Sequence, residues 1–250
     1  MMTSYPKEFY SDLEGTALPS ARRIVPILVD LTAPAAVVDF GCGDGSWLSV
    51  FRDHGATRIL GLDGDWVDER QLRIPPADFR RAHLDRAVAV DGRFDLAMSL
   101  EVAEHLPESR AAGFVAELAR LAPVVLFSAA PPFQGGMHHV NEQWPSYWAA
   151  LFADHGFRPL DILRWQVWND PQVTWWYKQN LLLFARDDAI RAHPKLAAAA
   201  ANAPREPIAV VHPEKFADTV RLTQPRFGRW LKMAPDALRR SLRRPARKKP

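Results

Sequence analysis

The segment Val37-Val38-Asp39-Phe40-Gly41-Cys42-Gly43-Asp44-Gly45 contains the strongest structural signal in the sequence. A short apolar, β-branched run over residues 36–40 leads directly into glycines spaced two apart, which is typical of a buried strand ending at a tight loop. Residues 45–54 then have the pattern of a helix, whose N-terminus offers N–H groups to a carboxylate. The third glycine stands one place earlier than in the GxGxxG loop of dinucleotide sites, and Asp39 precedes the first. Both departures favour a ligand built from a nucleoside and an amino acid over a pyrophosphate.

Strand and helix patterns alternate on both sides of this loop, which predicts a parallel sheet with right-handed crossovers. A helix is predicted over 20–31, with Ser20 as its cap, and another over 109–121. After Ser128 the composition changes to Pro, Gly, His and Trp, and a loop is predicted over 129–148. A helix over 145–155 and a linker over 197–207 are predicted further on. The other predicted strands are 58–62, 78–82, 94–100, 124–128, 160–168 and 180–185.

Two acids follow the second and third predicted strands. Asp63 closes the second strand, 22 residues after Gly41. A carboxylate about 20 residues beyond a glycine loop accepts both ribose hydroxyls in folds of this kind. Asp85 follows the weak third strand, and we expect it to contact an adenine amino group.

Three segments together resemble the class I S-adenosylmethionine-dependent methyltransferases: VVDFGCGDGSW, GLDGD and FDLAMSLEVAEHLP. The resemblance covers residues 20–186. It implies a Rossmann-like α/β fold of seven strands in the order 3-2-1-4-5-7-6, the last antiparallel, with helices on both faces. It also implies S-adenosylmethionine as cofactor and S-adenosylhomocysteine as product. By position, the loop with Gly41, Gly43 and Gly45 would face the methionine part, Asp63 the ribose, and Leu84 and Asp85 the adenine. Asp39 belongs to the same cofactor site, and Glu101 and His105 would lie beside the methionine and the acceptor pocket.

An oxygen acceptor must lose a proton during methyl transfer, and a histidine suits that role. His139 is the first candidate base, with His138 and His105 as substitutes. Beside the paired histidines, Asn141, Glu142 and Trp144 are predicted to bind a sugar or a small hydroxylated metabolite, because an indole face and polar side chains suit such rings. The stretch GGMHHVNEQWPSYW also resembles methyltransferases found with glycan and polysaccharide enzymes. Trp165 and Trp168 are predicted to be core or sheet residues.

Other chemistries fit less well. Ser99-Leu100-Glu101-Val102 stands where amino-methylating enzymes of adenine and glutamine carry (Asn/Asp)-Pro-Pro-(Tyr/Phe). The single cysteine, Cys42, lies inside the glycine loop, which excludes a covalent cysteine mechanism and an internal disulfide. No carboxylate set for metal-dependent catechol methylation is evident, so no metal is expected. Two alternatives stay open: a non-catalytic S-adenosylmethionine-binding partner or sensor module, and an RNA methyltransferase.

Charge is unevenly distributed along the 250 residues. The net charge is +3, but residues 239–250 carry +7, so residues 1–238 carry −4. An acidic body argues against nucleic acid as a partner. Residues 230–244 fit a basic amphipathic helix, which suits an anionic membrane surface. The lack of a leader-like start or an apolar run of roughly 18 residues predicts a cytoplasmic protein, peripheral to the membrane if the tail binds it.

Four segments are expected. Residues 1–35 form a helical lead-in, and residues 36–190 form the methyltransferase domain. Residues 191–238 form an Ala/Pro linker with a helical appendage, and residues 239–250 form a disordered basic tail.

Overall fold

The computed structural model describes residues 7–204, 206 and 208–223. The chain divides into a unit of Met1–Val210 and a unit of Val211–Pro250. In the second unit the described structure is chiefly one helix, α9 (Pro213–Thr223). The predicted amphipathic helix over 230–244 and the tail over 239–250 lie outside the described residues. None of the described helices is long and apolar enough to cross a membrane.

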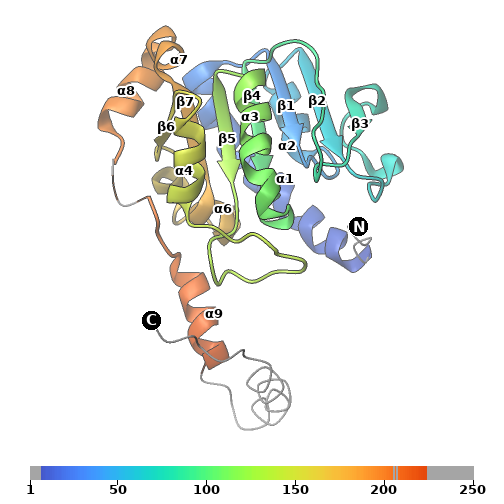
Figure 1. Cartoon of the computed structure of the whole chain (residues 1–250), viewed down its shortest axis with the longest axis vertical. Helices are drawn as coiled ribbons and strands as arrows, with labels where there is room; N and C mark the ends of the chain where they lie inside the picture. Colours follow the sequence, from blue (N-terminus) through green and yellow to red (C-terminus); the bar gives the residue numbers. More distant parts are fainter. Residues whose placement is uncertain (1–6, 205, 207, 224–250) are drawn as a thin grey trace. The chain divides into compact units, whose positions relative to one another are not determined.

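A seven-stranded sheet forms the centre of the first unit (Figure 1). The strands lie in the order β3-β2-β1-β4-β5-β7-β6, and neighbours are parallel except where β7 pairs with β5 and β6. The predicted strand order with an antiparallel last strand is confirmed. The strands are β1 (Ala36–Phe40), β2 (Arg58–Asp63), β3 (Phe79–Arg81), β4 (Leu96–Leu100), β5 (Val124–Ser128), β6 (Phe157–Leu160) and β7 (Leu182–Arg186).

Helices cover both faces of this sheet, and each face has its own apolar core (Figure 1). Val37 of β1 packs in the core under α1 and α2, and the next residue, Val38, packs in the core under α3 and α4. This alternation buries both faces of the central strands, as parallel sheets require. The helices are α1 (Lys7–Thr32), α2 (Ser46–Asp53), α3 (Ala111–Leu121), α4 (Pro145–Ala153), α5 (Arg164–Val167), α6 (Trp175–Asn180), α7 (Asp187–Ala192) and α8 (Pro194–Asn202). Short 3₁₀ helices occur at Glu69–Gln71, Pro76–Asp78, Ala103–His105 and Glu108–Arg110.

Helix α1 is longer than predicted, and Ser20 is not its cap. Ser20 is fully buried within the helix, where its hydroxyl donates to the carbonyl of Thr16 at 2.8 Å. The same oxygen accepts a hydrogen bond from the backbone N–H of Thr174 at 3.1 Å. A serine that suggests a helix start in sequence therefore ties α1 to the segment before α6.

The predicted strand over 160–168 is wrong, because β6 ends at Leu160 and helix α5 follows. The cause is a buried ion pair: the Arg164 guanidinium donates to both carboxylate oxygens of Asp161, at 2.8 and 2.6 Å, and to the carbonyl of Gln179 at 2.7 Å. The chain turns here to satisfy these charges. Trp165, predicted as a core or sheet residue, is 46% exposed as a result, and it packs against the partly buried Trp168.

The alanine-rich part of the predicted linker is helical. Residues 197–202 belong to α8, and Leu196 and Ala200 of this helix are buried in the core shared with α1. Alanine has the highest helix propensity, so the run continues a helix once one face is buried.

Candidate active site

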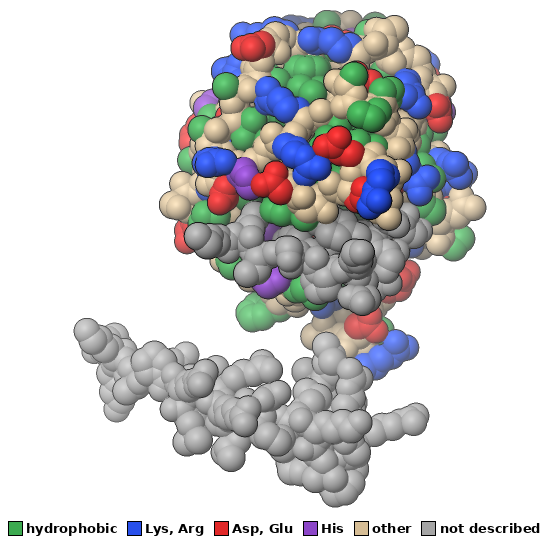
Figure 2. Space-filling model, turned by 90° about the vertical axis from the view of Figure 1, so that its right-hand side faces the viewer, with side chains coloured by type: hydrophobic (Ala, Val, Ile, Leu, Met, Phe, Trp, Pro, Cys, Tyr) green, Lys and Arg blue, Asp and Glu red, His purple; other side chains and the backbone are tan. Residues whose placement is uncertain are grey.

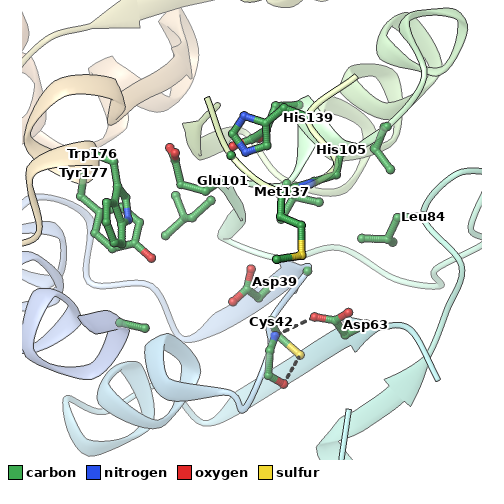
Figure 3. A pocket seen from close by; sticks show the side chains of 18 of the residues that line it. Asp39, Cys42, Asp63, Leu84, Glu101, His105, Met137, His139, Trp176 and Tyr177 are labelled. Atoms are coloured by element: carbon green, nitrogen blue, oxygen red, sulfur yellow. Dashed lines mark hydrogen bonds between the residues drawn. The ribbon is translucent and has the colours of Figure 1, made fainter. Parts of the chain in front are cut away.

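A cavity of about 340 Å³ lies where the carboxyl ends of β1, β2 and β4 meet the loop after β5 (Figure 3). Asp39 and Asp63 line one side of it, while Glu101, His105 and His139 line the opposite side. Met137 extends from the loop between these two groups (Figure 3). Ligands of open α/β sheets bind at this edge.

The glycine loop after β1 forms the floor of the cavity. Gly41 and Gly45 have φ values of +90° and +77°, which side chains other than glycine rarely adopt. A Cβ atom on Gly41 would lie 2.3 Å from Cγ2 of Val102, whereas a Cβ atom on Gly43 would meet nothing within 4 Å. Gly41 therefore allows a close approach of two chain segments, and Gly43 leaves space in the cavity.

Asp63 joins the glycine loop to the end of β2. One oxygen of its carboxylate accepts the N–H of Gly43 and the other that of Gly64, each at 2.7 Å. Burial raises the pKa of Asp63, and these backbone donors oppose the rise. The carboxylate thus holds the loop while facing the cavity.

Asp39 is 2% exposed, and its Oδ1 has no hydrogen-bond partner among the described residues. Burial, and then the nearby Asp63, raises the pKa of Asp39 well above its usual range. A buried oxygen of this kind is unfavourable unless a ligand supplies a donor.

The two predicted adenine contacts lie in different surroundings. Leu84 is buried and lines the cavity. Asp85 is exposed and is not among the residues that line it.

Glu101 has a φ of +56° just beyond β4, and its carboxylate is held by two side-chain amides. Asn180 donates from Nδ2 at 3.0 Å, and Gln134 donates from Nε2 at 3.0 Å. Burial raises the pKa of Glu101, and the Asn180 amide is the largest of the effects that lower it. Sequence reasoning missed Asn180 and Gln134, which are 79 and 33 residues away from Glu101.

His139 is oriented by Glu142. Nδ1 of His139 lies 2.9 Å from Oε1 of Glu142. Glu142 also accepts the N–H groups of Phe133 and Gly135, at 2.9 and 2.8 Å, and so holds the loop together. Glu142, which was predicted to bind the acceptor, is not among the cavity-lining residues, and its carboxylate makes these contacts within the loop.

The three candidate bases are not equivalent in position. The His105 ring meets the His139 ring edge-on, with centroids 4.8 Å apart, and both line the cavity. Burial, and then His139, lowers the pKa of His105 to about 4, so its imidazole is neutral near pH 7. His138 is exposed and is not among the cavity-lining residues.

Glu104 is a cavity residue that the sequence analysis did not single out. It is fully buried, and its carboxyl group lies near its own backbone N–H, that of Ala130 and the Glu101 side chain, without close hydrogen-bond geometry to them. Burial, and then Glu101, raises the pKa of Glu104 well above its usual range, and Glu142 adds to the rise. Its backbone carbonyl accepts the N–H groups of Val140 and Asn141, at 2.9 and 3.0 Å.

The predicted acceptor residues Asn141 and Trp144 are likewise not among the lining residues. Asn141 is 3% exposed, and its Oδ1 accepts a hydrogen bond from Gln143. Trp144 is 43% exposed and precedes α4. The aromatic wall of the cavity consists instead of Trp47, Trp66, Trp175, Trp176 and Tyr177.

The strand order, the glycine loop after β1 and the acid after β2 define a class I methyltransferase. Residues 17–169 match the family model described as a methyltransferase domain, and the chain belongs to this family.

Solved structures with the same fold include Streptomyces venezuelae DesVI, with 13% identity over 74% of this chain and 100% of that chain and a TM-score of 0.54. The magnesium protoporphyrin IX methyltransferase of Synechocystis, solved with bound S-adenosylhomocysteine, has 19% identity over 68% of this chain and 84% of that chain, with a TM-score of 0.47. A comparison of this chain with curated proteins found no match.

Proposed function

We propose that this methyltransferase binds S-adenosylmethionine in the cavity and methylates an oxygen of a sugar or a small hydroxylated metabolite. The cofactor supplies an electrophilic methyl group on a sulfonium centre. The protein must then position the acceptor, exclude water and help to remove the hydroxyl proton.

The residues around the glycine loop fit this cofactor. The unpartnered oxygen of Asp39 suits the ammonium group of its methionine part. The carboxylate of Asp63, already fixed by two N–H groups, has lone pairs left for ribose hydroxyls. Leu84 offers an apolar surface to the adenine.

The contact between His139 and Glu142 is the observation that supports oxygen methylation. When the imidazole is neutral, Glu142 favours the proton on Nδ1, so Nε2 keeps its lone pair for activating a hydroxyl. His105 is a weaker base because its pKa is lowered to about 4. The aromatic wall, including Trp176, provides ring faces on which a small cyclic acceptor can lie.

The test is to incubate the full chain with S-adenosylmethionine and a panel of sugars and hydroxylated metabolites, and to measure S-adenosylhomocysteine release. With an acceptor in hand, His139→Ala should lower the single-turnover rate about 10²–10⁴-fold, the usual contribution of general-base catalysis. Cofactor affinity, measured by calorimetry, should change little. His155→Ala, at an exposed position, is the matched control. A parental rate for His139→Ala would overturn the proposed role of His139.

The two alternatives give different results in the same assays. A binding module would bind S-adenosylmethionine and methylate nothing, and it would have no use for an oriented histidine. An RNA methyltransferase would need a positive surface for phosphates. Figure 2 shows a face of the molecule on which the described Lys and Arg side chains are interspersed with Asp and Glu, which does not favour RNA.

A further inference from the structure

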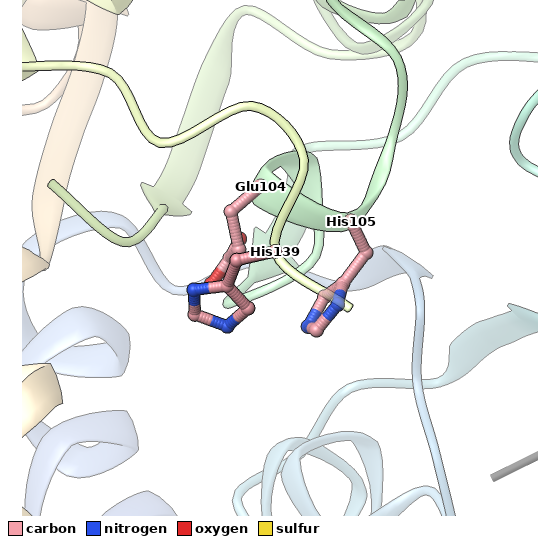
Figure 4. Close-up of side chains that lie close together, drawn as sticks. All are labelled: Glu104, His105 and His139. Atoms are coloured by element: carbon pink, nitrogen blue, oxygen red, sulfur yellow. The ribbon is translucent and has the colours of Figure 1, made fainter. Parts of the chain in front are cut away.

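Two histidines and a carboxyl group converge at the edge of the cavity (Figure 4). Glu104 and His105 lie on the 3₁₀ helix Ala103–His105 after β4, and His139 comes from the loop after β5. One potential ligand atom of each residue lies within 4.8 Å of the other two. Imidazole nitrogen and carboxylate oxygen are common ligands of divalent transition metals.

The surroundings of Glu104 favour a cation. The side chain is fully buried, and its carboxyl oxygens make no hydrogen bond of close geometry with the described residues, although the backbone N–H groups of Glu104 and Ala130 and the Glu101 side chain lie near. A buried carboxylate is strongly unfavourable unless a positive charge or hydrogen-bond donors compensate it. Glu101 and Glu142 add further negative charge near the same point. A divalent cation held by Glu104 and the two imidazoles would compensate this negative charge and favour the ionised form of Glu104.

Both histidines have the outer contacts that metal-binding histidines usually have. A ligating imidazole typically hydrogen bonds through its other nitrogen to a carboxylate or a backbone carbonyl, which fixes the ring. Nδ1 of His139 lies 2.9 Å from Glu142, and the His105 ring bonds to the backbone of His138.

We propose that Glu104, His105 and His139 bind a divalent transition-metal cation at the edge of the cofactor cavity. Two ligands of one ion are at most about 4.2 Å apart, twice the metal–nitrogen distance. The ligand atoms, within 4.8 Å of one another, must therefore approach by only some tenths of an ångström. Three protein ligands leave coordination positions open for an acceptor hydroxyl.

This inference rests on the proposed function and deepens it. It changes one part of that proposal: with the cation bound, the Nε2 lone pair of His139 would be used as a metal ligand, and the cation would take over the activation of the hydroxyl. A hydroxyl bound to such a cation has a lowered pKa and releases its proton to water more readily. The site would then favour acceptors with a second oxygen that can also bind the ion, such as vicinal diols.

The experiment titrates Co²⁺ into the full chain after chelator treatment, by calorimetry and by visible absorption, with no acceptor present. We expect one Co²⁺ per chain and a spectrum that shows nitrogen ligands. Glu104→Gln, His105→Ala and His139→Ala should each abolish this binding. Glu142→Gln should weaken it about 10–100-fold, as loss of an outer contact usually does. His155→Ala, outside the cluster, should bind Co²⁺ like the parent.

Binding of S-adenosylhomocysteine by each variant shows that it has folded. Absence of Co²⁺ binding to the parent, or equal binding in Glu104→Gln and His105→Ala, would overturn the proposal. If Co²⁺ binding depends on all three residues but no hydroxylated compound is methylated, the metal site stands and the proposed function fails. If a hydroxylated compound is methylated at full rate after chelation and Co²⁺ does not bind, the proposed function stands and the metal site fails.

Discussion

Replacing Gly41 with alanine tests the role of the glycine loop most directly. Gly41 has a φ of +90°, and an added Cβ would lie 2.3 Å from Cγ2 of Val102. A left-handed conformation costs a residue with a side chain roughly 1–2 kcal/mol. An extra methyl group in a packed site costs about 1–3 kcal/mol, and a β-branched valine has little freedom to move away. Gly41→Ala should therefore lower the free energy of unfolding by about 2–5 kcal/mol.

Urea unfolding followed by circular dichroism measures this change, and two further variants separate its parts. Gly43→Ala has a positive φ but no clash, so it should lose only about 1–2 kcal/mol. Its methyl group would enter the cavity, so this variant should lose S-adenosylmethionine affinity while staying folded.

The double variant Gly41→Ala/Val102→Ala removes the atoms that clash. It should recover about 1–3 kcal/mol relative to the sum of the single changes. If Gly41→Ala is no less stable than Gly43→Ala, or if Val102→Ala gives no recovery, the steric argument for the close approach at Gly41 is refuted.

Three further predictions follow from the site and the tail. Asp63→Ala should weaken S-adenosylmethionine binding by about 1.5–3 kcal/mol, the range for a hydrogen bond to a charged group, and unchanged affinity in calorimetry would contradict the ribose contact. Because the folded-state pKa of Asp39 is raised, its ionisation opposes folding at neutral pH, and this penalty falls as the pH drops through that pKa. In urea titrations Asp39→Asn should therefore gain more stability over the parent at pH 8 than at pH 5, and a gap independent of pH would count against a buried ionised Asp39. Deleting residues 239–250 should reduce binding to anionic vesicles in sedimentation, most clearly at low salt, and leave turnover of a soluble acceptor intact. Lost turnover would place the tail in the site.

The fold was predictable because its signals are local. The run from Val37 to Gly45 contains both the strand and the turn that ends it, and the spacing to Asp63 reflects one strand–helix–strand unit. The same local signals singled out Asp39, Gly43 and Asp63, which line the cavity.

The acceptor side depends on contacts between distant segments, which a single sequence does not show. Asn180 reaches Glu101 across 79 residues. Glu104 matters because its carboxyl group is fully buried beside Glu101 and two histidines, and nothing in its neighbours in sequence indicates that burial. Trp144 stands beside the histidines in the chain, but helix α4 starts directly after it, and the aromatic wall includes Trp175 and Trp176 from α6 instead.

The hydrogen bonds that hold the loop after β5 bear on how substrate enters the cavity and how product leaves it. Gln134 is tied to Glu101, and the N–H groups of Val140 and Asn141 are tied to the carbonyl of Glu104. A short segment that contains Met137 spans these two anchors above the cavity. Glu142 also holds Gly135 and His139 within this segment, so we expect it to move outward only as one piece, after the anchors release, while the sheet and the glycine loop stay in place. The rate at which product is exchanged for substrate would then depend on the opening of this segment. It would be largely independent of the global stability of the domain.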